Sequence, residues 1–245
     1  MTNFKSLLII LFLIFSNFWI YKIFRNNFLI GLIIVTLSIL LVSVKSFKYK
    51  RIIILGLFLS SLFFQYQTTK INNFSTLTAD QIRIQEVRFK QYPAEILGIN
   101  FPLGYWFEMK HESYIIPGIS KNLYENLDIN QYFFGGHPRQ RVEVEEFEKF
   151  PYSFIPLFIL GLLVIFSKKK LALKLLFLSS PLVLIALIGN KNLLGPFSLF
   201  PMFIFIIWQG FSVLCNLKKR KWIISLFIIL SFLVSVQQFI YGGII

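Results

Sequence analysis

The residues of this chain that could supply carboxylate or imidazole chemistry all lie in one stretch. All eleven carboxylates and both histidines fall between Gln67 and Pro151. Outside that stretch the 245-residue sequence is a series of apolar runs interrupted by Lys and Arg. Acid–base chemistry that needs a carboxylate or a histidine is therefore confined to one segment.

The most suggestive run in that segment extends from Asp128 to Arg141. Paired glycines permit backbone conformations that turn successive N–H groups toward an anion, and a guanidinium can bind phosphate in a bidentate manner. The run therefore predicts a phosphate or lipid-phosphate site. Its candidate ligands are Gly135, Gly136, His137, Arg139 and Arg141. The alternative is a simple turn whose arginines pair with the glutamates of Glu143–Glu148, because such exposed pairs are common and contribute little.

Asp128 is the candidate catalytic carboxylate, because it is close in sequence to the glycine pair that would hold a phosphate beside it. His137 is a possible general base, but no nucleophile or second histidine is placed near it by spacing. His111 and His137 are 26 residues apart, and nothing resembles a zinc-binding histidine or cysteine motif. We therefore predict neither a metal site nor a cofactor.

The composition shows what surrounds this segment. Hydrophobic residues make up 56% of the chain, thirty residues are Phe, and the mean hydropathy is +0.69, which is more apolar than an average soluble domain. Because a membrane span needs about 20 mostly apolar residues, the runs predict seven spans. They are Ser6–Tyr21, Phe28–Val44, Ile52–Tyr66, Tyr152–Phe166, Leu171–Ile188, Leu193–Leu214 and Trp222–Ile240.

The predicted fold class is an all-α polytopic membrane protein with about seven transmembrane helices. One extracytoplasmic, loop-rich layer lies between the third and fourth helices. The predicted domains are residues 1–66 with three spans, residues 67–150 outside the membrane, and residues 151–245 with four spans. Within the outer segment we expect a helix from Thr78 to the stop at Tyr92-Pro93, and a second helix around Ser120–Leu127.

The short loops set the orientation, because cytoplasmic loops carry an excess of Lys and Arg. Thirteen basic residues fall on the side of the amino terminus and only three in the opposite short loops. We therefore expect an inner (cytoplasmic) membrane protein with the amino terminus in the cytoplasm and the carboxyl terminus outside. The net charge of +14 is explained by orientation and by attraction to anionic lipid, so nucleic acid is not an expected partner.

Irregular backbone is expected at the outer ends of the last four spans. Prolines stand at 151, 156, 196 and 201, near the outer ends of the fourth and sixth spans, and Pro181 lies within the fifth. Non-helical backbone at membrane depth is tolerated where protein or a watery cavity surrounds it. The prolines therefore suggest a pocket edged by Asn190, Lys191 and Asn192, although ordinary kinked packing would have the same signature.

The run from Tyr132 to Pro151, the apolar span after it and the run Asn190–Pro201 resemble part of a larger family. They are similar to the carboxyl-terminal half of the C-type membrane glycosyltransferases, which use polyprenyl-phosphate sugars. There a polar outer segment ends in a Phe-Phe-Gly turn with nearby arginine. The resemblance covers about the last half of the chain, and it implies that Arg139, Arg141 and Lys191 contact a lipid phosphate. The chain departs from the family in its first outer loop, Lys22–Asn27, which has no Asp or Glu.

Three functional interpretations follow. The first is an integral membrane protein whose extracytoplasmic segment binds a membrane lipid, a saccharide or a partner protein. The second is a glycosyltransferase-like enzyme that acts on a lipid-linked sugar and uses a carboxylate such as Asp80 or Asp128. The third is a non-catalytic subunit of a membrane assembly, with a partner membrane protein.

Overall fold

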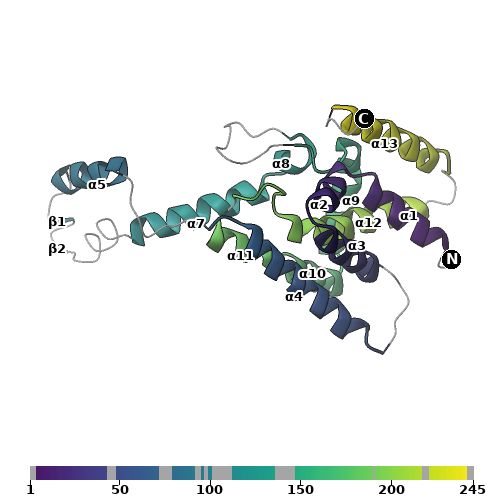
Figure 1. Ribbon diagram of the computed structural model, residues 1–245, viewed down its shortest axis with the longest axis horizontal. Coiled ribbons are helices and arrows are strands. Elements are labelled where there is room, and N and C mark those ends of the chain that lie inside the picture. The colour runs from purple at the N-terminus through teal and green to yellow at the C-terminus, as the bar shows by residue number, and fades with distance from the viewer. Residues whose placement is uncertain are drawn as a thin grey trace.

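The structure is a computed structural model that describes residues 4–42, 48–71, 79–91, 95–96, 99–100, 112–135, 147–189, 191–216 and 221–241. Over these ranges the chain is almost wholly helical (Figure 1). The α-helices are α1 (Phe4–Phe15), α2 (Phe18–Asn26), α3 (Phe28–Val42), α4 (Lys50–Thr68), α5 (Ala79–Gln91), α7 (Glu112–Leu127), α8 (Asn130–Phe133), α9 (Ile155–Phe166), α10 (Lys169–Leu178), α11 (Ser180–Ile188), α12 (Phe200–Asn216) and α13 (Lys221–Tyr241). Two 3₁₀ turns, η1 (Tyr152–Phe154) and η2 (Phe197–Leu199), precede α9 and α12, and the strands β1 (Glu95–Ile96) and β2 (Ile99–Asn100) form a short antiparallel hairpin.

Several helices are long and apolar enough to cross a membrane. Among the described residues these are Lys50–Thr68, Lys169–Ile188 and Phe197–Cys215, with a fourth if the bent pair α1–α2 is one span. Three shorter apolar helices accompany them, at Phe28–Val42, Tyr152–Phe166 and Ser225–Ile240. Each of the seven predicted apolar runs thus contains helix, and the chain is a helical protein suited to a membrane.

The first predicted span differs from the expected continuous helix. α1 and α2 meet at an angle of 75°, with the break at Ser16 and Asn17. The amide Nδ2 of Asn17, which is fully buried, donates to the carbonyls of Leu13 and Ile14. The last carbonyls of a helix have no partner within that helix. At the end of α1 the side chain of Asn17 bonds to two of them, in place of the N–H groups that a continuing helix would supply. This polar cap explains a break that no proline or glycine marks.

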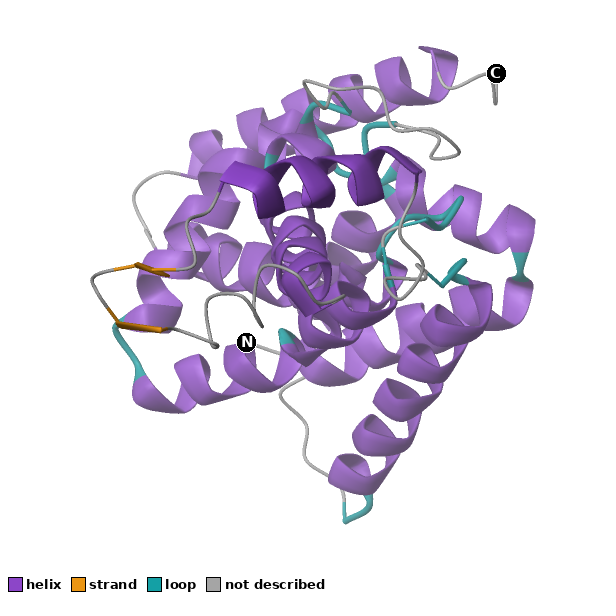
Figure 2. Cartoon of the chain, turned by 90° about the vertical axis from the view of Figure 1, so that its left-hand side faces the viewer, coloured by secondary structure: helices purple, strands orange, loops and turns teal. Residues whose placement is uncertain are grey.

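Helix α12 is the most buried of the three long candidate spans and packs most extensively against α9 and α3 (Figure 1). Figure 2 shows the same bundle from its side, with helices making up nearly all of the described chain. Glycines let α9 and α12 approach closely: a Cβ added at Gly161 would lie 2.8 Å from the carbonyl carbon of Ile206, and one at Gly210 would lie 2.8 Å from that of Leu157. Small residues at such crossings are typical of helix pairs in membranes. Above this crossing the ring of Phe150 stacks on those of Phe200 and Phe203.

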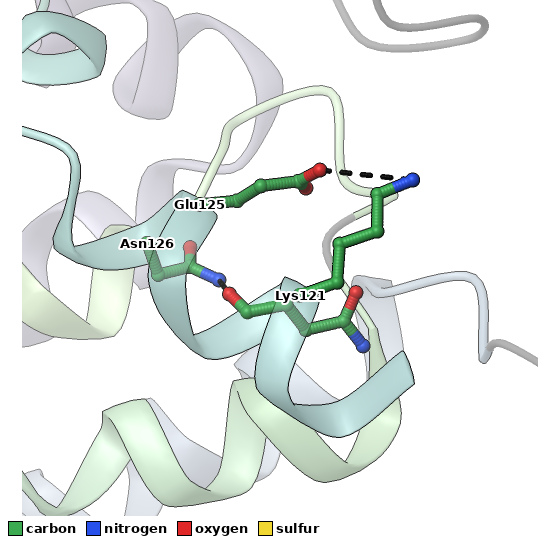
Figure 3. A network of polar contacts seen from close by, with 4 residues as sticks. Lys121, Glu125 and Asn126 are labelled. Atoms are coloured by element: carbon green, nitrogen blue, oxygen red, sulfur yellow. Dashed lines mark hydrogen bonds and ion pairs between the residues drawn. The ribbon is translucent and has the colours of Figure 1, made fainter. Parts of the chain in front are cut away.

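The described part of residues 67–150, the predicted outer segment, is mainly helical. Helix α5 begins and ends where the sequence predicts, directly after Thr78 and directly before Tyr92. Helix α7 begins eight residues earlier than the predicted Ser120 and continues through Pro117. It packs along α11 and leads away from the bundle toward α5 (Figure 1). Its own polar contacts include the ion pair of exposed Lys121 with the largely buried Glu125, at 3.9 Å (Figure 3).

Two polar side chains anchor α7 and α8 to the bundle. The Nδ2 of Asn122 donates to the carbonyl of Ala186 in α11 at 3.1 Å, and the hydroxyl of Tyr132 donates to the carbonyl of Asn126 at 2.8 Å. Asn122, Asn126 and Tyr132 are all buried. Their bonds satisfy carbonyls near the ends of α11 and α7, where a helix has no partners of its own, and they bring α8 onto the bundle.

Candidate functional site

The glycine turn predicted to bind an anion begins with the expected backbone. Gly135 has a φ of +63°, in the left-handed region that favours glycine. A Cβ at this position would lie 2.8 Å from the backbone nitrogen of Glu148. Gly136, His137, Arg139 and Arg141 lie outside the described residues. Gly135, which precedes these four residues, therefore lies beside Glu148, which follows them in the chain and directly precedes Lys149.

Backbone bonds hold this junction on the bundle. The N–H groups of Lys149 and Phe150 both donate to the carbonyl of Tyr132, at 3.0 and 2.8 Å. The rings of Tyr132 and Phe150 in turn pack against the buried indole of Trp19 in α2. The chain thus enters and leaves the predicted anion-binding segment at one anchored point.

Lys149 is the most unusual side chain of this junction, because it is a lysine with only 3% of its surface exposed. Its Nζ donates to the carbonyl of Gln131 at 2.9 Å. It lies 5.9, 5.5 and 5.1 Å from the ring centres of Trp19, Tyr132 and Phe147. A desolvated ammonium over an aromatic face gains about 2 kcal/mol, which offsets part of the cost of burying a charge. The surrounding rings form an aromatic cage.

A second ammonium, that of Lys22 in α2, reaches the same cage. Nζ of Lys22 lies 4.2 Å from the ring centre of Phe147 and 5.5 Å from that of Phe18. Lys22 is partly exposed. Two cations that are 127 positions apart in the chain thus share one ring, at the point where the predicted anion-binding segment is anchored. We call Trp19, Lys22, Tyr132, Phe147 and Lys149 the Phe147 cluster.

A carboxylate stands beside the cluster. Oε2 of Glu148 accepts a hydrogen bond of 2.7 Å from Nε2 of Gln238 in α13, and the same amide donates to the carbonyl of Phe150 at 3.3 Å. Glu148 is partly buried, and it precedes Pro151 at the start of the fourth predicted span. The Gln238 amide therefore holds this glutamate close to the start of the fourth predicted span.

The loop between α11 and α12 packs against two members of the cage, Lys149 and Trp19. Gly195 has a φ of +67°, and a Cβ there would lie 2.9 Å from Cε of Lys149. The indole Nε1 of Trp19 donates to the carbonyl of Leu194 at 2.6 Å. The absence of a side chain at position 195 therefore makes room for the lysine stem, and Trp19 contacts both the lysine and the loop.

Gln65 of α4 fixes the same loop. Its Oε1 accepts from the N–H of Ser198 at 3.1 Å, and its Nε2 donates to the carbonyl of Gly195 at 3.3 Å. Gln65 is almost completely buried. An amide at this depth is tolerated because both of its ends are bonded, and those bonds set the position of the loop.

Lys191, the third predicted phosphate contact, lies at the start of this loop. Its carbonyl accepts from the N–H of Lys70 at 2.9 Å, in an isolated antiparallel bridge between the two residues. Both lysine side chains are exposed. Lys191 is therefore placed beside the end of α4. Asn192, also predicted to edge a pocket, is buried, and Asn190 lies outside the described residues.

Asp128, the predicted catalytic carboxylate, has a local role. Its Oδ1 accepts from the N–H of Asn130 at 3.0 Å, and its carbonyl accepts from the N–H of Gln131 at 3.2 Å. This is the pattern of an Asx turn, in which an aspartate satisfies the backbone two residues ahead. Asp128 thus begins α8, and Glu148 is the carboxylate that stands next to the Phe147 cluster.

Sequence reasoning missed Trp19, Lys22, Gln65 and Lys149 as members of one site. A partial signal existed for Lys149, because it lies between aromatic residues, Phe147 and Phe150, directly before a proline that opens an apolar run. No spacing rule links it to Trp19, which is 130 positions earlier. Among the described residues, no group of three His, Cys, Asp or Glu side chains could hold a metal ion.

Comparison of the chain with family models, with curated proteins and with solved structures found no match.

Proposed function

We propose that this is a seven-span protein of the cytoplasmic membrane, whose outer end binds the phosphate of an anionic, lipid-linked ligand. The amino terminus is inside, the carboxyl terminus is outside, and residues 67–150 form the extracytoplasmic segment. The proposal has two parts, the topology and the ligand, which rest on different observations.

Contacts between distant segments support the topology. Positions assigned to the outer face meet one another: Lys70 bonds to Lys191, and Glu148 bonds to Gln238 near the end of α13. At the opposite end Lys50 and Lys174, both assigned to the cytoplasmic side, lie close enough for their charges to interact. Loss of any one of the third to seventh spans would place at least one of these pairs on opposite faces of the membrane.

Reporter fusions test the topology directly. A reporter joined after Ile245 should read extracytoplasmic, and one inserted in Lys168–Lys170 should read cytoplasmic. The physical reason is the excess of basic residues on the cytoplasmic side. A cytoplasmic signal from the fusion after Ile245 would mean that the number of spans is wrong by one.

The observation that supports the ligand is the pair of ammonium groups on the ring of Phe147, 4.2 Å away for Lys22 and 5.1 Å away for Lys149. Lys149 is buried, so its charge is poorly screened, while Lys22 is accessible enough to touch a ligand. A site that is lined by charges of one sign and has low-dielectric walls concentrates the electric field of those charges. The predicted anion-binding segment, with Arg139 and Arg141, is anchored at this place.

The geometry favours a phosphate at the membrane surface over a deeply bound ion. Lys149 donates to the carbonyl of Gln131, so its ammonium group is held in place and contributes a fixed positive electric field, not a direct bond to the ligand. Direct bonds come from Lys22 and from the arginines, and hydrogen bonds to charged groups contribute about 1.5–3 kcal/mol each. Glu148 reduces the positive charge of the site, which favours a ligand whose phosphate is accompanied by a polar head group.

Binding of a long-chain isoprenyl phosphate to the purified protein in detergent tests the ligand. Lys22→Gln should weaken binding about tenfold or more, from the loss of one charge-assisted bond, and the joint change Arg139→Gln with Arg141→Gln should weaken it further. Arg25→Gln is the matched control, because Arg25 lies on the same helix, is exposed, and carries the same charge. Equal losses for Lys22→Gln and Arg25→Gln would reduce the effect to general surface charge and contradict the proposal.

Glu148 favours a second candidate function, a transferase that acts on a polyprenyl-phosphate-linked sugar. A carboxylate base for such an enzyme must face the outer ends of the spans, and the Gln238 bond holds Glu148 there. General-base catalysis contributes about 10²–10⁴-fold. If the chain is such an enzyme, Glu148→Gln should abolish transfer while Asp128→Asn leaves most of it. The leading proposal expects no transfer by the wild-type protein, so robust turnover that depends on Glu148 would replace it.

A further inference from the structure

Helix α7 lies against a turn of α11 that belongs to a candidate membrane span. Nδ2 of Asn122 donates to the carbonyl of Ala186 at 3.1 Å, and the two helices pack along each other (Figure 1). Ala186 lies two residues before the end of the candidate span Lys169–Ile188. Because a helix rises about 1.5 Å per residue, this bond holds α7 at a level about 3 Å inside the end of that span.

The side of α7 that faces away from this bond is exposed. Asn122 and Asn126 are buried and lie one turn apart on the side of the helix that contacts α11. Tyr124 and Leu127 are 71% and 52% exposed, and their spacing of three residues places them on one face. At about 100° of rotation per residue, that face points away from the two asparagines. The last two turns of α7 therefore carry an exposed apolar face at the level of the span.

Two more large apolar side chains are exposed directly after α7. They are Ile129, the N-cap of α8, and Phe134, its C-cap. Single exposed apolar side chains are normal on any protein, so exposure alone does not decide what surrounds these residues. The contact of α7 with Ala186 does, because it places this part of the chain beside a helix that is long and apolar enough to cross a membrane.

Lipid is the occupant that the neighbouring surface indicates. Val183 and Leu187 lie within one turn of Ala186 in the candidate span, and both are exposed, so in a membrane they face lipid. Tyr124 suits the boundary of the same lipid, because tyrosine has an apolar ring and a polar tip and is enriched at membrane interfaces. Lys121, one turn earlier, has a flexible stem that can carry its charge toward the head groups.

We propose that the last two turns of α7 lie in the boundary of the bilayer, with Tyr124 and Leu127 in contact with lipid. Under the proposed topology this is the outer leaflet, so part of the predicted outer segment is embedded in the membrane. Tyr132 of the Phe147 cluster follows Leu127 by five residues, which brings the lipid surface close to that cluster. The proposal rests on the membrane crossing of α10 and α11, and it does not depend on the ligand of the cluster.

Fluorescence quenching in phosphatidylcholine vesicles tests the lipid contact. Cys215→Ser removes the only cysteine of the chain, and Tyr124→Cys or Leu127→Cys then carries one small fluorescent label. Phosphatidylcholine brominated on its acyl chains should quench both labels, at least about half as strongly as a label at Leu176→Cys, which is exposed within the candidate span. Quenching is weaker at the boundary because the boundary lies about 15 Å from the centre of the bilayer. Iodide, which stays in water, should quench both labels only weakly.

Glu86→Cys on α5 is the aqueous control, because Glu86 is exposed and a carboxylate is costly in lipid. Iodide should quench its label strongly, and the brominated lipid should not. The proposal is overturned if the labels on α7 behave like the label at position 86, which would place them in water. It is also overturned if neither quencher reaches them, as under a partner protein or a second copy of the chain. If the label at Leu176 also escapes the brominated lipid, the proposed topology fails together with this proposal.

Discussion

The crossing of α9 and α12 offers the sharpest test of the bundle, because glycine is required there on both helices. A Cβ at Gly161 would lie 2.8 Å from the carbonyl carbon of Ile206, and one at Gly210 would lie 2.8 Å from that of Leu157 and 3.0 Å from the backbone nitrogen of Gly161. Ordinary contact begins near 3.4 Å. Alanine at either position therefore pushes backbone against backbone, and neither helix can relieve the clash by turning a side chain.

The helices must separate, because the carbonyl oxygens of Ile206 and Leu157 lie even closer to the added Cβ atoms than the carbonyl carbons do, and the contacts of the whole crossing then weaken. Overpacking of a core costs about 1–3 kcal/mol and occasionally more. A clash with backbone belongs at the upper end, so we expect Gly161→Ala and Gly210→Ala each to lower the free energy of unfolding by about 3 kcal/mol. At roughly 2–4 °C per kcal/mol for a chain of this length, the melting midpoint in detergent should fall by about 6–12 °C. The double variant should lose less than the sum, because both methyl groups open the same crossing.

Gly56→Ala is the matched control, because Gly56 lies in the exposed part of α4 and a Cβ there would meet nothing within 4 Å. Alanine is favoured over glycine within a helix by about 1 kcal/mol, so this variant should melt at the wild-type temperature or slightly above it. The assay is the loss of monodisperse protein with temperature, measured by size-exclusion chromatography. If Gly161→Ala melts together with Gly56→Ala, the close approach of α9 and α12 is refuted.

Three further substitutions test the contacts that hold the loop between α11 and α12. Gln65→Leu strands the N–H of Ser198 and should cost about 1–3 kcal/mol, whereas Gln67→Leu, on the exposed side of the same helix, should leave the melting midpoint unchanged; equal midpoints would refute the role of the amide. Trp19→Phe keeps an aromatic ring but loses the 2.6 Å bond to Leu194, so proteolysis within the loop between α11 and α12 should become faster at a cost of about 1 kcal/mol. Gly195→Ala forces a side chain into a left-handed conformation and against Lys149, so its melting midpoint should fall below that of the wild type; a midpoint equal to that of Gly56→Ala would contradict both effects.

Composition and hydropathy predicted the helical, membrane-suited character of the chain, because a long apolar run leaves helix as the main way to satisfy the backbone in lipid. Each predicted apolar run contains helix, and the helix expected between Thr78 and Tyr92 is present as α5. The left-handed φ of Gly135 is one of the backbone conformations that the glycine pair permits. These features depend on local sequence alone.

Features that depend on contacts across the chain were not predictable in the same way. The break at Asn17 arises from one amide that bonds to the turn before it, and asparagine within an apolar run gives no reliable sign of that. Helix α7 extends past Pro117 because it is supported along α11. The burial of Lys149 needs Trp19 and Tyr132 from two other segments. Asp128 was predicted because it is close in sequence to the glycine pair, whereas Glu148 lies between two members of the cluster, Phe147 and Lys149.

The use of polar side chains within the bundle bears on what kind of membrane protein this is. Gln65, Asn192 and Trp19 bond to one another's segments or to the loop between α11 and α12, and Gln238 bonds to the junction that carries Glu148. These buried groups hold loops at one end of the bundle, while ion-coupled carriers generally need ionisable groups at mid-membrane. Because the buried amides of this bundle fix the positions of loops at one end, that end is suited to hold a binding surface. The proposed ligand site lies at this end of the bundle, where Lys149 would be its fixed charge and Lys22 the group that contacts the ligand.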